Sequence, residues 1–162
     1  MPDGLYDTDL LAWSREQAGR LRRVAAGERI NDLDWANVIE EIEGLGASEL
    51  RAVQSLITVA VLHGLKIIAW PDHPAAEHWM GELATFVAQA KVRLQPGMVQ
   101  RLPAGDILDR TLRDFRKLVT TFPVAPGPVP TEARFTTADF LDPDFGARDL
   151  LDRLRAGIAA PA

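Results

Sequence analysis

The sequence predicts an all-α protein, an up-and-down bundle of four to five main helices with a partly extended C-terminal tail. Apolar residues recur at helical spacing along most of the chain. No alternating run typical of a strand exceeds a few residues, and no Asn-Gly or Asp-Gly pair joins two such runs. With 162 residues, 47% of them hydrophobic and 25% charged, the chain has the size and composition of one ordinary globular domain.

Two helices are predicted in the first part of the chain. The first begins near Asp7 or Thr8, which are both favourable caps, and ends at Gly27. Asp34 caps the second, whose apolar face is predicted from the spacing of Trp35, Val38, Ile39, Ile42 and Leu45.

The same apolar stripe resumes beyond residue 50 and reaches Trp70. Two interpretations remain open: one helix from Trp35 to Trp70, or a break at residues 44–48 with Ser48 capping a new helix. Each glycine in a helix interior costs roughly 1 kcal/mol relative to alanine, so Gly44 and Gly46 favour the break. The most apolar stretch, residues 56–70, is shorter than the roughly 20 residues of a membrane span and predicts a buried central helix and no membrane association.

The rest of the chain is predicted to be helical as well. Pro71 and Pro74 bracket a turn, and helices follow over residues 75–94 and 104–122. Four prolines in residues 123–130 predict a stiff connector. Thr136 or Thr137 caps a short helix that ends at Leu141, and a tail helix covers residues 147–157. We therefore expect residues 1–122 to form the bundle core and residues 123–162 to pack on the same single domain.

Composition and charge exclude several classes of function. Cysteine is absent, which excludes disulfides and thiolate metal sites. A net charge of −5 disfavours binding to nucleic acid, and the acidic start of the chain lacks the pattern of a secretion signal, so we expect a cytoplasmic protein. Residues 1–50 hold eleven acids and five arginines, whereas residues 91–120 hold seven basic residues and three aspartates. Such opposed blocks can face each other within the fold or across two copies.

Four motifs carry a family resemblance. They are YDTD at residues 6–9, LDWxNxxEEIExLG at 33–46, HxLK at 63–66 and LDPDF at 141–145. In this order they resemble the bacterial family known as domain of unknown function 29. The resemblance implies a compact all-helical protein and no established activity. The sequence departs from the family pattern at Ala36, where glutamate is usual, and at Ile67, where an aromatic residue is usual.

The acidic cluster of the second motif suggests a metal site or an ordinary solvated helix face. Glu40 and Glu43 share one face at a spacing that carboxylate ligands use in helical bundles, and Glu41 lies beside them. A two-metal bundle site also needs Glu-x-x-His pairs, and none occurs in the sequence. In a continuous helix Glu43 and His63 are about 30 Å apart, so they cannot share an ion. We expect a solvated face.

His63, His78 and Glu82 form the better candidate for a divalent metal, since two histidines and a carboxylate are a known open ligand set. His63 lies on the apolar stripe, however, where a lone histidine is more often a hydrogen-bonded core residue. For the same reason we expect His63 and Lys66 to form a polar tie in the core rather than an acid–base pair. No bound cofactor is expected.

A basic helix face is predicted at Arg110, Arg113, Arg116 and Lys117, and it needs no special purpose opposite a core stripe. No nucleophile motif or phosphate loop occurs. The sequence thus favours a non-enzymatic module that binds another protein or a second copy of itself, over a metal-dependent enzyme. The residues that we expect at an interaction surface are Trp35, Glu40, Glu41, Glu43, His63, Lys66, Arg113 and Arg116.

Overall fold

The computed structural model describes residues 4–159, in which all regular structure is helical and no strand occurs. The prediction of an all-α protein is confirmed. The chain divides into two compact units, one ending at Ser48 and the other starting at Glu49. The main buried apolar cluster lies in the second unit, and the first unit buries only a few side chains of its own. The two units are described separately below.

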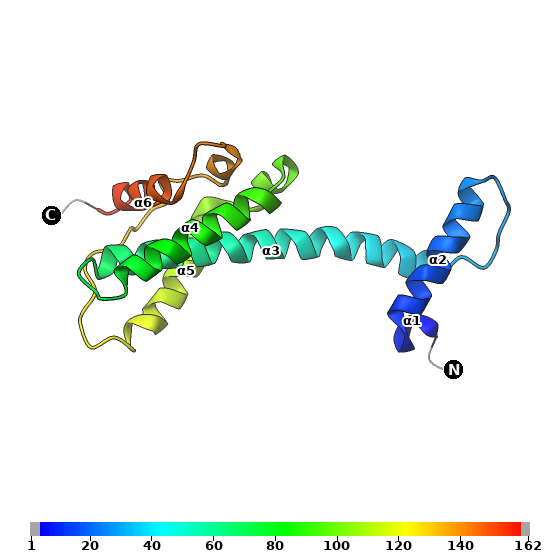
Figure 1. Ribbon diagram of the computed structural model, residues 1–162, viewed down its shortest axis with the longest axis horizontal. Coiled ribbons are helices and arrows are strands. Elements are labelled where there is room, and N and C mark those ends of the chain that lie inside the picture. The colour runs from blue at the N-terminus through cyan, green and yellow to red at the C-terminus, as the bar shows by residue number, and fades with distance from the viewer. Residues whose placement is uncertain (1–3, 160–162) are drawn as a thin grey trace. The chain divides into compact units, whose positions relative to one another are not determined.

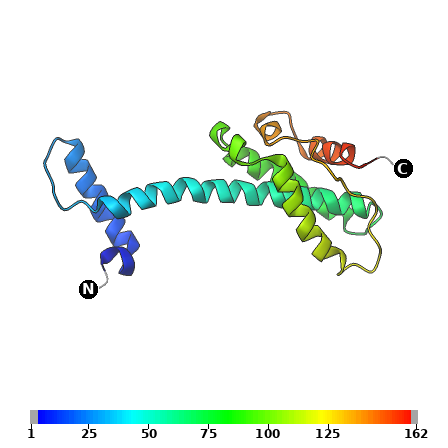
Figure 2. The same ribbon diagram turned by 180° about the vertical axis from the view of Figure 1, so that it is seen from behind.

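Unit 1 consists of α1 (Leu5–Thr8), α2 (Leu10–Ala25) and the first turns of α3 (Trp35–Ala69). Figures 1 and 2 show α1 and α2 beside the beginning of α3. Asp9 caps α2 by accepting a hydrogen bond from the Ala12 amide. The predicted caps Asp7 and Thr8 lie in α1 instead, so that prediction is wrong. Gly27 ends the helix with a φ of 87°, a left-handed conformation that favours glycine.

Unit 1 buries few side chains. Asp34 is the centre of its polar contacts, because its carboxylate accepts from the Trp13 indole at 3.1 Å and from the Asn37 side chain at 2.8 Å. The Gln17 side chain accepts in turn from the Asp34 amide at 3.0 Å. The buried residues of this unit are Trp13, Gln17, Leu33 and Val38. Such a small core leaves most apolar side chains of the unit without cover.

α3 is one unbroken helix from Trp35 to Ala69, so the break that the sequence favoured at residues 44–48 is wrong. Gly44 and Gly46 both keep negative φ angles, and nothing lies within 4 Å of where their Cβ atoms would be. The cost of about 1 kcal/mol for each glycine is thus a matter of propensity alone, with no packing conflict added. Good helix formers on both sides of the two glycines carry the helix through.

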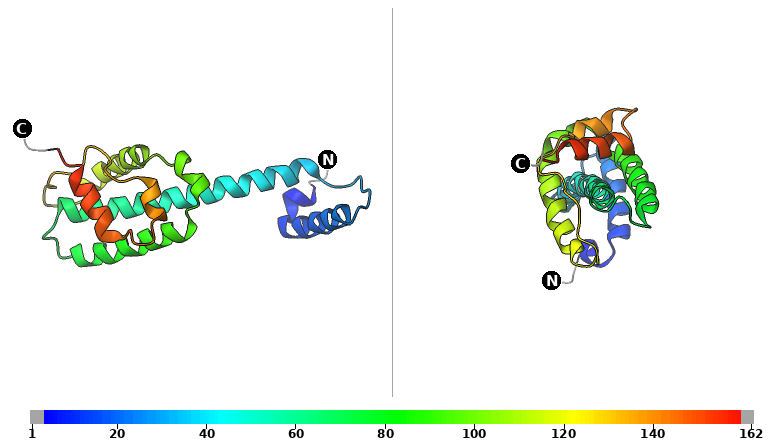
Figure 3. Two further views of the ribbon diagram at one scale, coloured as in Figure 1. Left: turned by 90° about the horizontal axis from the view of Figure 1, so that it is seen from above. Right: turned by 90° about the vertical axis from the view of Figure 1, so that its left-hand side faces the viewer.

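Unit 2 is built around the second half of α3. It contains α4 (Ala76–Arg93), η1 (Pro96–Arg101), α5 (Ala104–Val119), η2 (Thr137–Leu141) and α6 (Ala147–Ala156). Figure 3 shows this part of α3 in the middle, with α4 on one side, α5 on the other, and η2 and α6 across a third. The side chains of Val53, Ile57, Val61 and Leu65 are fully buried there. The predicted central helix is confirmed for this half of α3.

The C-terminal segment packs on unit 2. The Trp70 indole donates to the Val124 carbonyl at 2.8 Å and so holds the proline-rich connector. The Lys91 ammonium donates to the carbonyls of Pro143 and Phe145, both at 2.7 Å. Thr136 caps η2, one of the two caps that the sequence proposed. Residues after the connector thereby contribute to the same core as α4 and α5.

Among the described helices, α3 is long and apolar enough to cross a membrane by length and composition, with a mean hydropathy of 1.7 over 18 residues. The central helix of a globular protein has the same properties when its apolar face is buried. In unit 2 the protein itself provides this cover for the second half of α3.

Candidate functional site

His63 and Lys66 lie half-buried on α3 where it packs against α4. The Nδ1 atom of His63 is 2.9 Å from the Val59 carbonyl oxygen, and its ring stacks on Phe86 with the centroids 5.7 Å apart. Burial lowers the pKa of His63, and the Val59 hydrogen bond opposes this shift. Burial therefore favours the neutral form of this hydrogen-bonded ring. Its contacts are those of a structural residue.

The ammonium group of Lys66 lies 4.5 Å from the centre of the Trp79 ring, a cation–π contact. Burial lowers the pKa of Lys66, and the nearby Glu82 carboxylate opposes this. Lys66 thus contacts an aromatic face of α4, where the sequence analysis expected a polar tie in the core. His73 stacks on the same indole at 4.6 Å.

The proposed metal ligands are not assembled as a site. Within the described range, no three His, Asp or Glu side chains come together in a way that could hold a metal ion. His78 and Glu82 do meet across one turn of α4, at 4.0 Å, and both are exposed or partly exposed. His63 makes its hydrogen bond to its own helix instead. The geometry gives the metal hypothesis no support.

The acidic cluster of α3 lies at the surface of unit 1. The Tyr6 hydroxyl donates to Glu41 at 2.7 Å, and this bond raises the pKa of Tyr6 to about 12. Glu40 and Glu43 are exposed and form no ion pair within residues 4–159. The YDTD and LDW motifs therefore meet in space, and the contact that joins them is a structural one.

An apolar stripe runs along the exposed side of the same helix. Trp35 is 54% exposed, Ile39 52%, Ile42 66% and Leu45 69%. We call these four residues the N-terminal stripe. The sequence analysis placed them on an apolar face together with Val38, and only Val38 is buried. Leu5, Leu10 and Leu11 of unit 1 are exposed as well.

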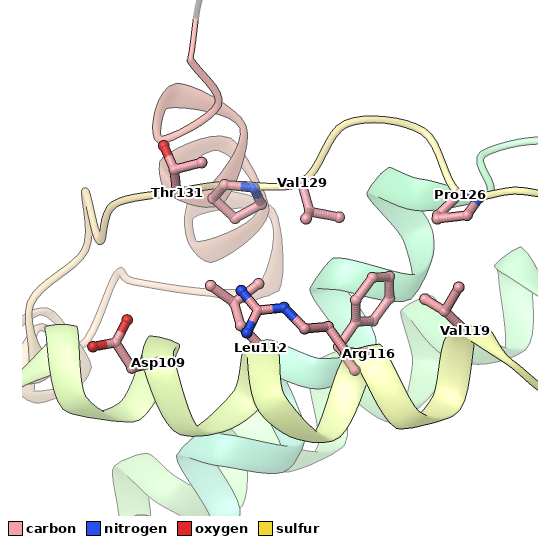
Figure 4. A pocket seen from close by; sticks show the side chains of 9 residues that line it. Asp109, Leu112, Arg116, Val119, Pro126, Val129 and Thr131 are labelled. Carbon is pink, nitrogen blue, oxygen red and sulfur yellow. The ribbon is translucent and has the colours of Figure 1, made fainter.

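A groove lies between α5 and the proline-rich connector in unit 2. Its volume is about 430 Å³, and α5 contributes Leu112, Phe115, Arg116 and Val119 to it. Figure 4 shows side chains rising from α5 toward the connector, from which Val129 points back toward them. We call this the α5 groove. Arg116 and Arg113 are the two basic residues that the sequence analysis expected at an interaction surface. Arg113 lies one helical turn before Arg116 and is also exposed.

The predicted interaction residues thus fall into three separate places. Trp35 and the glutamates belong to unit 1, His63 and Lys66 to the interface of α3 with α4, and the arginines to α5. Sequence reasoning missed the groove, because its wall formed by the connector depends on a tertiary contact. The sequence analysis also failed to predict that Ile39 and Ile42 are exposed to solvent. The composition of α2 gave no signal for this, since half of its residues are apolar and four are arginines.

The family and the solved structure that this chain resembles are both described as of unknown function. Residues 5–146 match the family described as Domain of unknown function DUF29. The fold is similar to the crystal structure of an alpha-helical protein of unknown function from Rhodospirillum rubrum, with a TM-score of 0.70 and 29% sequence identity. That similarity covers 94% of this chain and 98% of the other. No curated protein matches the sequence. Since the family match extends over most of the residues, the chain belongs to the DUF29 family.

Proposed function

We propose that the protein is a non-enzymatic protein-interaction module whose contact surface is the N-terminal stripe. The single observation behind this proposal is that four large apolar side chains on successive turns of α3 are each more than half exposed. Monomeric soluble proteins rarely leave such a contiguous patch open to water, and patches of this kind mark interaction sites.

The energetics point the same way. Full burial of a Leu, Ile or similar side chain is worth about 1.5–3 kcal/mol. Unit 1 leaves this stabilisation unused at Ile39, Ile42 and Leu45 while it buries only a handful of residues. A unit of this size has a small core, and small natural domains commonly add stability by oligomerisation, disulfides or a metal. A partner protein that covers the stripe supplies this missing burial.

The stripe also has the spacing of a helix that docks in a groove. Trp35, Ile39 and Ile42 stand at positions i, i+4 and i+7, the anchor pattern of amphipathic helices bound by partner proteins. Trp35 is suited to be an anchor at the start of the stripe, since tryptophan is enriched at interaction hot spots. The exposed glutamates beside the stripe would form its polar rim.

Site-specific photo-crosslinking tests this proposal. A photoreactive amino acid at position 42 in the stripe should give a discrete protein adduct in cells, whatever the partner is. The same amino acid at Gly44 is the matched control, because that position is exposed on the opposite side of the helix and has nothing within 4 Å of its Cβ direction. Equal adduct yields from both positions, or none from position 42, would overturn the proposal.

A further inference from the structure

We propose that the occupant of the N-terminal stripe is a second copy of this chain, and that the stripe docks in the α5 groove of that copy. This rests on the proposed function, because it names the partner for the same surface. Three features carry it: the shape of the stripe, the lining of the groove, and the charges beside each.

The α5 groove has the lining that an apolar helix ridge requires. Leu112, Phe115 and Val119 supply its floor from α5, and Pro126 and Val129 supply the opposite wall. A volume of about 430 Å³ lies in the range of clefts that hold several apolar side chains. The stripe presents its anchors along one line, and the groove runs along α5 in the same linear manner (Figure 4).

Charge complementarity supports a second copy of the chain as the partner. Arg113 and Arg116 are exposed on α5 and form no ion pair within the described chain. Glu43 follows Ile39 by one helical turn at the edge of the stripe, and Glu40 lies one turn before Glu43; neither has an ionic partner among residues 4–159. Docking would bring these opposite charges together at the rim of the contact. Complementary charges of this kind select partner and orientation more than they add affinity.

The orientation follows from the one acid in the groove. Asp109 lines the end that lies two helical turns before Arg116. Glu43 is therefore favoured near Arg116 and disfavoured near Asp109. A docked α3 thus has one preferred direction along α5 rather than two equivalent ones.

The contact is heterologous, since a surface of one copy meets a different surface of the other. Every copy carries both surfaces, so two such contacts can close a dimer or successive contacts can continue into a larger assembly. In either form, a variant with a damaged stripe and a variant with a damaged groove should still bind each other. A copy with a damaged stripe still offers its groove, and a copy with a damaged groove still offers its stripe.

The test is size-exclusion chromatography with light scattering, from low to high micromolar protein. The stripe variant carries Ile39→Asp and Ile42→Asp, and the groove variant carries Arg113→Glu and Arg116→Glu. Matched controls are Val92→Asp, an 86% exposed apolar residue of α4, and Arg148→Glu on α6. Circular dichroism and thermal unfolding establish that each variant is folded.

The wild-type protein and both controls should associate as concentration rises, and each variant alone should weaken association roughly tenfold or more. An equimolar mixture of the two variants should form a one-to-one complex, because one intact stripe meets one intact groove. A wild-type chain that stays monomeric at all concentrations overturns this inference, as does a groove variant that associates normally or a mixture that stays monomeric. If position 42 crosslinks to a different protein while the wild type stays monomeric, the interaction function survives and the second copy is excluded as the partner.

Discussion

The two halves of α3 carry the same apolar periodicity and meet opposite surroundings. Ile42 in the first half is 66% exposed, whereas Ile57 in the second half is fully buried. In unit 2, α4, α5 and the C-terminal segment surround the helix. In unit 1, Val38 is the one apolar residue in this half of α3 that is buried, and Trp35, Ile39, Ile42 and Leu45 are exposed. Periodicity therefore defines which face of a helix is apolar, and the neighbouring elements decide whether that face is a core or a binding surface.

The contrast also separates two roles for the family motifs. Asp34 and Glu41 of the second motif join α3 to α2 and α1 through hydrogen bonds to Trp13 and Tyr6. Lys66 of the third motif joins α3 to α4 through the Trp79 ring. Both motifs hold the helix in place, and neither assembles a set of groups with evident catalytic geometry.

The largest expected effect comes from paired truncations on the same helix. Ile57→Ala should lower the free energy of unfolding by about 2–5 kcal/mol, because it removes fully buried methylene and methyl groups and leaves a cavity. Ile42→Ala should change it by less than about 0.5 kcal/mol in dilute protein, since the side chain is in water. Urea unfolding at low protein concentration measures both. Equal losses would show that residue 42 is already covered within a single chain, and the comparison would fail.

Smaller changes in stability are expected from alanine at two glycines of α3, and the two changes should have opposite signs. A Cβ at Gly64 would lie 2.5 Å from a methyl carbon of the buried Leu154, so Gly64→Ala should destabilise by about 1–3 kcal/mol. A Cβ at Gly44 meets nothing within 4 Å, so Gly44→Ala should stabilise by up to about 1 kcal/mol through helix propensity. Thermal unfolding of the two variants against wild type gives the signs. A destabilising Gly44→Ala would mean that this side of unit 1 is closely packed.

The third difference between the units is their response to mild acid. The pKa of His63 is lowered by burial, so its contribution to stability is complete above the ordinary value of about 6.5 and is lost as the pH falls below it. The pKa of Asp34 is lowered chiefly by the Asn37 hydrogen bond, so its contribution is lost only as the pH falls below about 3.9. Between these values unit 2 should weaken through His63 while the Asp34 contribution to unit 1 persists.

Hydrogen exchange by mass spectrometry resolves this difference, because peptides from α2 and from the second half of α3 report on each unit separately. His63→Gln should flatten the pH dependence of the α3 peptides and leave that of the α2 peptides unchanged. An unchanged slope in the α3 peptides of His63→Gln would assign the effect to another group.

Local signals in the sequence were sufficient to predict where several of the helices begin or end. Asp34, Gly27 and Thr136 were predicted as caps or terminators and act as such, because capping depends on groups within a few residues. The continuity of α3 was predicted wrongly, since glycine propensity is a weak term beside the neighbouring helix formers.

Features that depend on tertiary neighbours were beyond the sequence. The aromatic partner of Lys66 comes from another helix, and the groove of α5 needs the connector that Trp70 holds through Val124. The exposure of Ile42 depends on how much apolar surface α2 can offer. A periodic pattern alone is the same for a buried helix face and for an exposed one.

Trp35 is a built-in reporter for the docking of a second copy on the N-terminal stripe, because it is one of the four stripe residues. The other three tryptophans, Trp13, Trp70 and Trp79, are 6% exposed or less, so acrylamide should quench chiefly the fluorescence of Trp35 in dilute protein. Raising the protein concentration should shift the emission to shorter wavelength and reduce quenching, and Trp35→Phe should abolish the change. Emission and quenching that stay constant from low to high micromolar protein would contradict the account.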